Sequence, residues 1–306
     1  MRTALNPAKL IWLYARGLSA SRYGDAHRVV GMTLDRYGRA LGRRLLFSGN
    51  YRVLGQAVWL LINPVSITRY FEFPFVLECL PEAPGRWLDV SSPRLLSLYV
   101  ADNALAETLE VINPDWRDLS ATAAIVKQLG CSRVQCDCVY LHEALRGTSE
   151  FDCIWSISVI EHISGNYSDS EAFKMMYEAL KPGGRLIITV PVDRTFYEEF
   201  RDNDIYSLNV VPRGSKYFFQ RVYDEYALYS RLLRPIGRRP AIMRWFGETV
   251  SGRYRKYERK WIAEGPLCTV DDPREIGEHY REYSSWAEMP GMGVCGMMII
   301  KEGCDN

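Results

Sequence analysis

The alternation of short apolar strands with amphipathic helices most constrains the fold of this chain. From Gly85 onwards the sequence contains strand-like runs such as RWLDV, FDCIWSISVI and RLIITVPV, separated by helical patterns such as SDSEAFKMMYEALKPGG. Strands that are apolar along most of their length are typical of sheets covered on both faces. This alternation predicts an α/β fold with a doubly wound, mostly parallel sheet.

The first 80 residues lack this rhythm. They are rich in arginine and tyrosine and predict an N-terminal helical extension or cap over residues 1–80. The PEAPG segment that follows is a break, so a second unit is expected over 81–306. Within that unit, a stretch at about 195–290 interrupts the alternation and is interpreted as a lid or insertion. GVCGMMIIKE then predicts the last strand.

Composition excludes several classes of function. The 306 residues include 38 Lys and Arg against 37 Asp and Glu, so the overall charge offers no general attraction for nucleic acid. Eight cysteines contain no CxxC pair, which argues against a zinc or other metal site and favours free thiols in a cytoplasmic protein. The most apolar segment, VLGQAVWLLINPVSI, is too short to span a bilayer and predicts a buried helix, with an interfacial helix as the alternative.

Two linked motifs carry a resemblance to a known family. FDCIWSISVIEHI, followed by EALKPGGRLIITVPV, resembles the fourth and fifth strands of class I S-adenosylmethionine-dependent methyltransferases. The resemblance covers roughly residues 85–192 and, more loosely, the last strand. It implies a Rossmann-like methyltransferase fold and an enzyme that uses S-adenosylmethionine and releases S-adenosylhomocysteine. The C-terminal part resembles bacterial members associated with polysaccharide or secondary-metabolite biosynthesis.

In a doubly wound sheet the ligand lies beyond the carboxyl ends of the strands. After the first strand, the predicted cofactor residues are Asp89, Ser91, Ser92 and Arg94. The family's three glycine positions correspond here to Ser91, Pro93 and Leu95. Side-chain hydroxyls and the Arg94 guanidinium are expected to replace the glycine contacts, with simple helix capping by the serines as the alternative.

The next two strand ends supply further candidates by the same resemblance. Asp115 is predicted to hold the ribose hydroxyls, although Asn113–Asp115 also reads as a plain turn. Asp137 matches the family position that accepts from the adenine amino group, with Cys138 beside the ring; a helix cap is the alternative for Asp137. Ser156, near the end of the fourth strand, is a further predicted cofactor contact.

The predicted catalytic residues are His162 and Glu161, which follow the fourth strand. A histidine has a solution pKa suited to a general base for an alcohol or phenol acceptor. The alternative is a pair that only packs and hydrogen-bonds within the fold.

These observations lead to two hypotheses. The first is O-methylation of a small molecule or a glycan. The second, favoured by the missing glycines, is a non-catalytic methyltransferase-fold partner or scaffold. A nucleic-acid methyltransferase is disfavoured, because SISV stands where an Asn/Asp-Pro-Pro-aromatic motif is expected. Residues 1–80 are expected to supply a lid, a homo-oligomer interface or a peripheral surface for a membrane-bound acceptor.

Overall fold

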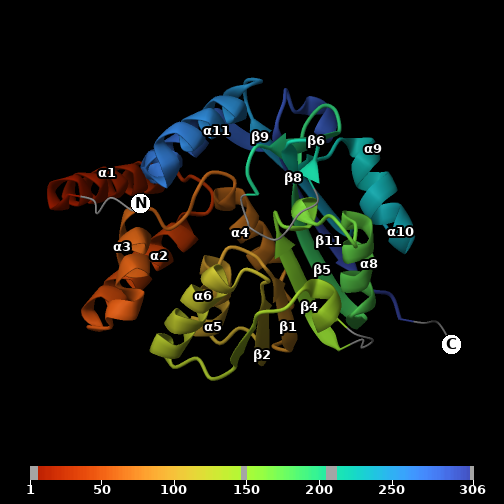
Figure 1. Cartoon of the computed structure of the whole chain (residues 1–306), viewed down its shortest axis with the longest axis horizontal. Coiled ribbons are helices and arrows are strands. Elements are labelled where there is room, and N and C mark those ends of the chain that lie inside the picture. The colour runs from red at the N-terminus through yellow and green to blue at the C-terminus, as the bar shows by residue number, and fades with distance from the viewer. Residues whose placement is uncertain (1–5, 146–149, 205–211, 304–306) are drawn as a thin grey trace.

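The computed structural model describes residues 6–145, 150–204 and 212–303 (Figure 1). An eight-stranded sheet in the order β10-β9-β11-β5-β4-β1-β2-β3 forms its centre. The strands are β1 (Arg86–Val90), β2 (Thr108–Ile112), β3 (Val134–Asp137), β4 (Phe151–Ile157), β5 (Leu180–Val192), β9 (Ile242–Glu248), β10 (Tyr280–Tyr283) and β11 (Gly293–Ile300).

The sheet has the predicted doubly wound, mostly parallel arrangement. The run β3-β2-β1-β4-β5 is parallel throughout, and β11 is antiparallel to both β5 and β9. Two tryptophans, Trp87 on β1 and Trp155 on β4, are fully buried at its centre. The chain reverses its direction of winding between β1 and β4, which is where such sheets bind ligands.

Helices cover both faces of the sheet, as predicted. On one face lie α5 (Leu95–Asp102) and α6 (Trp116–Leu129), and on the other lie α8 (Asp169–Glu178) and the helical stretch from Glu225 to Ile236. The sequence signals for their ends are confirmed: Ser168 forms a capping box with Glu171, and Gly130 ends α6 at a φ of 71°. Helix α8 ends before the predicted Lys-Pro-Gly-Gly stop, because Leu180 already pairs with Phe151 and begins β5.

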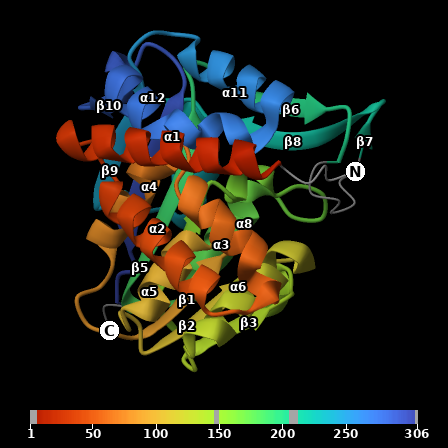
Figure 2. The same ribbon diagram turned by 90° about the vertical axis from the view of Figure 1, so that its left-hand side faces the viewer.

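The helices predicted in the first 80 residues form a cap against one face of the sheet. They are α1 (Pro7–Ala26), α2 (Met32–Phe47), α3 (Leu54–Ile62) and α4 (Arg69–Cys79), with a 3-10 turn, η1 (Tyr51–Val53), before α3. Figure 2 shows α1 lying across the outer side of this cap. Helix α4 joins the cap to the sheet, since Phe71 stacks on Phe246 of β9 with ring centroids 4.9 Å apart. No helix in the described residues is long and apolar enough to cross a membrane.

The stretch interpreted as a lid or insertion contains parts of both layers. A small antiparallel sheet is formed by β6 (Tyr197–Arg201), β7 (Pro212–Arg213) and β8 (Lys216–Val222), and it is followed later by α11 (Arg253–Glu264) and α12 (Asp272–His279). Strands β9 and β10 of the same stretch belong to the main sheet. Residues 205–211 of the stretch lie outside the described part of the chain.

Candidate functional site

A cavity of about 820 Å³ lies at the carboxyl ends of β1, β2 and β4. Its walls come from the turns after these strands, from the loop before α8, and from two elements further away in sequence. Arg69 enters from the first turn of α4, and Phe218 and Phe219 enter from β8. The volume is in the range of pockets that bury a small molecule or cofactor. The cavity therefore occupies the place that the sheet topology predicts for a ligand.

The turn after β1 is tied to its neighbours by side chains. Ser91 adopts a φ of 54°, a left-handed conformation that favours glycine, and its backbone N–H donates to the Ile112 carbonyl at 2.8 Å. The Ser92 hydroxyl accepts from the Ile157 N–H at 3.0 Å. Arg94 pairs with Asp118 of α6. The three side chains proposed to replace glycine contacts thus already have partners within the fold.

Asp89 supports this turn from behind. Its carboxylate is fully buried and accepts from the Ser92 N–H at 2.9 Å and from the Ser97 hydroxyl. Burial raises the pKa of this carboxyl to about 6, since desolvation disfavours the charged form. Asp89 does not line the cavity. The geometry gives it the role of shaping the turn.

Asp115 lies in the cavity wall after β2. Its Oδ1 accepts from the Arg117 N–H at 2.9 Å and caps α6, so the predicted turn and the cap are both present. Its Oδ2 has no hydrogen bond within the described residues. Asn113 lines the same wall and accepts from the Asp115 N–H at 2.9 Å. This carboxylate can therefore cap the helix and accept a ligand hydroxyl with its other oxygen.

The side chains after β3 differ from the predicted pair. Asp137 accepts from the Gln135 side chain at 2.8 Å, the thiol of Cys138 is 3.7 Å from the Pro114 carbonyl, and neither residue lines the cavity. Tyr140 and His142 line it instead. The contact of Asp137 with adenine stays a prediction, without support from this geometry.

Three rings stack in succession along this side of the cavity. The His142 ring lies 4.4 Å from the ring of Tyr167 and 5.8 Å from that of Tyr140, with small interplanar angles. Sequence reasoning missed Tyr140 and His142. The signal was the segment YLHE directly after the third strand.

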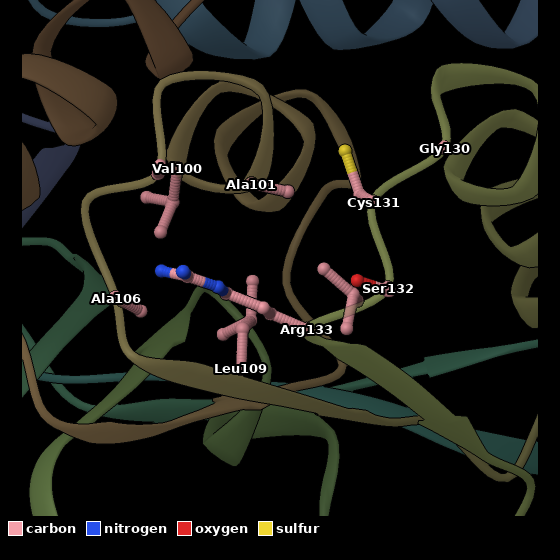
Figure 3. A pocket seen from close by; sticks show the side chains of 10 residues that line it. Val100, Ala101, Ala106, Leu109, Gly130, Cys131, Ser132 and Arg133 are labelled. Carbon is pink, nitrogen blue, oxygen red and sulfur yellow. The ribbon is translucent and has the colours of Figure 1, made fainter.

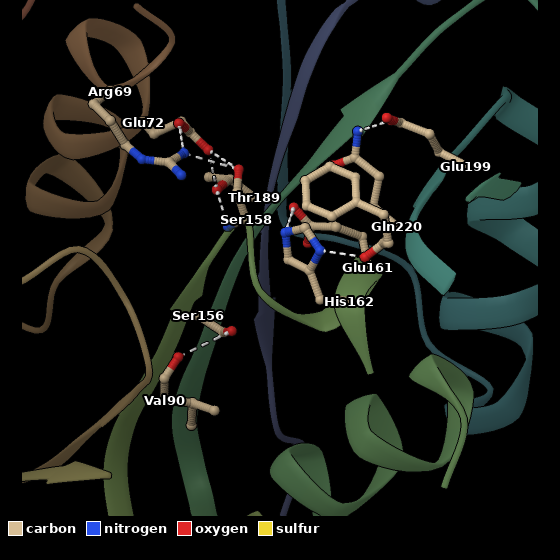
Figure 4. A network of polar contacts seen from close by, with 11 residues as sticks. Arg69, Glu72, Val90, Ser156, Ser158, Glu161, His162, Thr189, Glu199 and Gln220 are labelled. Atoms are coloured by element: carbon tan, nitrogen blue, oxygen red, sulfur yellow. Dashed lines mark hydrogen bonds and ion pairs between the residues drawn. The ribbon is translucent and has the colours of Figure 1, made fainter. Parts of the chain in front are cut away.

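His162 lines the far end of the cavity, where β8 closes over it. Its Nδ1 lies 2.6 Å from the Phe219 carbonyl oxygen (Figure 4). A carbonyl can only accept, so Nδ1 carries the hydrogen and the lone pair is on Nε2. Burial lowers the pKa of the ring to about 4, and the imidazole is neutral at physiological pH.

Glu161 lies behind His162 and does not line the cavity. Its Oε1 is 3.9 Å from His162 Nε2, and its Oε2 is buried without a hydrogen-bond partner in the described residues. Burial raises the pKa of this carboxyl well above its usual value. A neutral carboxyl beside the imidazole therefore fits the geometry better than an ionised one.

A polar network joins the cap to the same end of the cavity (Figure 4). Glu72 of α4 is completely buried and accepts from the hydroxyls of Ser158 at 2.5 Å and Thr189 at 2.6 Å. Arg69 pairs with Glu72 and donates to the Ser158 hydroxyl at 2.9 Å. The sequence did not reveal this network, because nearly ninety residues separate Arg69 from Ser158.

The structure thus divides the ten predicted site residues into two groups. Ser91, Ser92, Asp115 and His162 line the cavity, whereas Asp89, Arg94, Asp137, Cys138, Ser156 and Glu161 do not. Ser156 is buried one layer deeper and lies with its hydroxyl 3.3 Å from the Val90 carbonyl.

A second, smaller cavity of about 200 Å³ lies at the opposite edge of the sheet (Figure 3). It is lined by Leu109 at the start of β2 and by Cys131 and Arg133 before β3. Its position at the amino ends of the strands separates it from the larger cavity.

Comparisons with known proteins were made with this geometry in hand. Residues 101–188 match the family model described as a methyltransferase domain. A search of curated proteins found no match. Among solved structures, the chain is similar to coclaurine N-methyltransferase bound to N-methylheliamine and S-adenosylhomocysteine, with 10% identity over 96% of this chain and 94% of that one and a TM-score of 0.49.

Two further structures illustrate the range of the fold. The [4+2]-cyclase SpnF shares 19% identity over 75% of this chain and 79% of its own, with a TM-score of 0.45. Phosphoethanolamine N-methyltransferase 2 of Haemonchus contortus, in complex with S-adenosyl-L-methionine, shares 12% identity over 86% of this chain and 57% of its own, with a TM-score of 0.47.

The domain match spans the end of α5 through most of β5, which includes the turns after β2, β3 and β4 that border the cavity. The strand order agrees with the predicted Rossmann-like arrangement. The chain therefore carries the catalytic domain of a class I S-adenosylmethionine-dependent methyltransferase, with a degenerate cofactor loop in which Ser91, Pro93 and Leu95 stand at the glycine positions.

Proposed function

We propose that this methyltransferase O-methylates a small molecule or a glycan. The observation that carries the proposal is the neutral, buried imidazole of His162 at the end of the cavity where β8 and the cap meet. When bound, S-adenosylmethionine supplies an activated methyl group. The chain has to position a hydroxyl acceptor, exclude water and remove one proton.

His162 is suited to receive that proton. The Phe219 carbonyl fixes the hydrogen on Nδ1 and keeps the lone pair on Nε2. The low pKa ensures that the base is unprotonated before the reaction, and the hydroxyl becomes far more acidic once its oxygen begins to bond to carbon. The proton of the acceptor hydroxyl then passes to Nε2 and from there to solvent, while the oxygen keeps its electron pair for the new bond.

The cofactor side of the cavity offers a consistent set of groups. Asp115 Oδ2 is placed to accept from ribose hydroxyls, and the ring of His142 or Tyr140 offers a flat surface for adenine. Ser91 borders the same space from β1. Because the side chains of Ser92 and Arg94 are committed within the fold, we propose that this loop contributes shape and backbone groups more than side-chain contacts.

The acceptor side combines rings with polar groups. Phe218, Phe219 and Tyr167 line it together with Asn166 and the guanidinium of Arg69. Rings that stack on a sugar or an aromatic acceptor, with a few polar groups to orient it, suit both proposed acceptor classes.

Calorimetry with S-adenosylmethionine tests the cofactor assignment first. Asp115→Asn keeps the cap oxygen but removes the charge, and it should weaken binding about tenfold or more, since hydrogen bonds to charged groups contribute about 1.5–3 kcal/mol. Asp137→Asn is the matched comparison, from outside the cavity wall. A stronger effect of Asp137→Asn would show that adenine binds as the sequence resemblance implied. No binding by the wild type at millimolar ligand would favour a non-catalytic partner.

His162→Gln tests the base. With an identified hydroxyl acceptor, the turnover rate should fall by about 10²- to 10⁴-fold while the affinity for S-adenosylmethionine is retained. The wild-type rate should show no inflection near pH 6.5, because the imidazole is neutral down to a pH of about 4. Equal rates for wild type and variant, or exclusive activity on amines that need no such base, would contradict the proposal.

A further inference from the structure

The helical cap has a strongly uneven charge. Residues 6–71 contain ten Lys and Arg but only two acids, Asp25 and Asp35, which gives this segment a net charge of +8. The other 240 residues contain 28 basic and 35 acidic residues, a net charge of −7. The near-zero total therefore conceals a basic cap on an acidic body, and such asymmetry is typical of proteins that bind a polyanionic surface.

Half of these cap cations are exposed and free of ion pairs within the described residues. They are Lys9, Arg22, Arg28, Arg43 and Arg52. The two cap acids cannot offset them, because Asp25 pairs with Arg36 and Asp35 is buried against Arg39.

Large apolar side chains project from the same cap. The turn between α2 and α3 exposes Phe47 by 84%, Tyr51 by 78% and Leu54 by 46%, and the exposed side of α1 carries Ile11 and Trp12. Figure 2 shows α1, α2 and α3 together on the side of the molecule that faces the viewer. Arg43 and Arg52 lie on either side of the apolar turn in the sequence. Apolar side chains flanked by cations are the composition of segments that lie in the interface of an anionic bilayer.

We propose that the cap is a peripheral membrane-docking surface for anionic phospholipid. The α2–α3 turn inserts Phe47, Tyr51 and Leu54 at the level of the headgroups, and the exposed cations attract the negative surface. Aliphatic residues such as Ile11 and Leu54 favour lipid over single-stranded nucleic acid, because bases stack on rings and gain little from aliphatic side chains. This inference does not depend on the acceptor that the enzyme methylates.

Vesicle co-sedimentation tests the proposal. The full chain is mixed with vesicles of phosphatidylcholine alone or with 30% phosphatidylglycerol. Each attractive Lys or Arg near such a surface contributes about 1 kcal/mol, so partitioning into the anionic vesicles should be at least about tenfold stronger and should fall sharply between 0.1 and 0.5 M NaCl. Equal binding to neutral vesicles, or none to anionic vesicles at low salt, would overturn the proposal.

Two matched pairs of variants localise the surface. Phe47→Ser with Tyr51→Ser should reduce partitioning about tenfold or more, whereas Tyr226→Ser, 75% exposed on the acidic body, should leave it unchanged. Arg43→Glu with Arg52→Glu should act similarly, compared with Arg281→Glu on the edge strand β10. Circular dichroism verifies the fold of each variant. If the controls lose as much as the cap variants, or if polyuridylate displaces the protein from vesicles and binds the Phe47→Ser, Tyr51→Ser variant normally, lipid docking by this surface is wrong.

Discussion

Ser92 shows how a side chain has taken over a structural task in the cofactor turn. Its hydroxyl is the acceptor for the Ile157 N–H at the end of β4, and the residue is only 4% exposed. Alanine would leave this buried N–H without a partner, which costs about 1–3 kcal/mol. We therefore expect Ser92→Ala to lower the free energy of unfolding by that amount in urea titrations. The comparison is Ser120→Ala on the exposed side of α6, which should be neutral or slightly stabilising.

Asp89 should make stability depend on pH. Its folded pKa of about 6 lies above the unfolded value of about 3.8, so the folded state binds the proton more tightly between these values. The associated stabilisation is complete below pH 3.8 and is lost as the pH rises through 6, and it amounts to about 3 kcal/mol.

Asp89→Asn removes this titration. The difference in unfolding free energy, wild type minus variant, should therefore fall between pH 4 and pH 6 and stay constant above pH 7. Urea titrations of both proteins at several pH values measure it. A difference that is the same at all these values would show that Asp89 ionises normally in the folded protein.

At the scale of elements, the approach of α1 to α3 depends on one glycine. A Cβ at Gly17 would lie 2.5 Å from the Ile62 carbonyl oxygen, a backbone atom that can yield only if the helices separate. Gly17→Ala should therefore destabilise the protein by roughly 1–3 kcal/mol despite its better helix propensity. Gly55→Ala in α3 is the matched control, because a Cβ there has nothing within 4 Å, and it should stabilise by about 0.5–1 kcal/mol. Thermal melts of the two variants should shift in opposite directions.

The strands flanking the site were predictable from sequence because their signals are local. Strands β1, β2, β4 and β5 are apolar runs bounded by turns, and β11 is another. Strand β10 has the sequence YREY, whose charged side chains are tolerated because it is the edge strand, and no sequence pattern announced it.

The site was predicted less completely for the same physical reason. Residues that follow a strand, such as Asp115 and His162, can be found by their position in the motif. Arg69 reaches the cavity only through the packing of α4, and the contact that orients His162 comes from the backbone of Phe219. A carbonyl group has no signature in the sequence, and long-range packing is visible only in the fold.

At the scale of the whole molecule, the cap and the sheet share one hydrophobic core. Leu34 of α2 and Tyr70 of α4 are buried in the same cluster as Trp87 and Trp155 at the centre of the sheet. Chains of 306 residues often unfold in steps. Because the cap covers one face of the sheet, its departure would expose that face to water, and we expect cap and sheet to unfold together.

Hydrogen exchange along a urea series tests this cooperativity. Peptides from α2 in the cap and from β5 in the sheet should lose protection at the same urea concentration. If the cavity binds S-adenosylhomocysteine, a concentration 100 times its Kd should stabilise both by about 2.7 kcal/mol, because a ligand held between the strand ends and Arg69 of the cap favours the state in which both are folded. Loss of protection in α2 at a lower urea concentration, with β5 still protected, would show that the cap is an independently opening unit. Ligand binding would then be expected to move only the sheet transition.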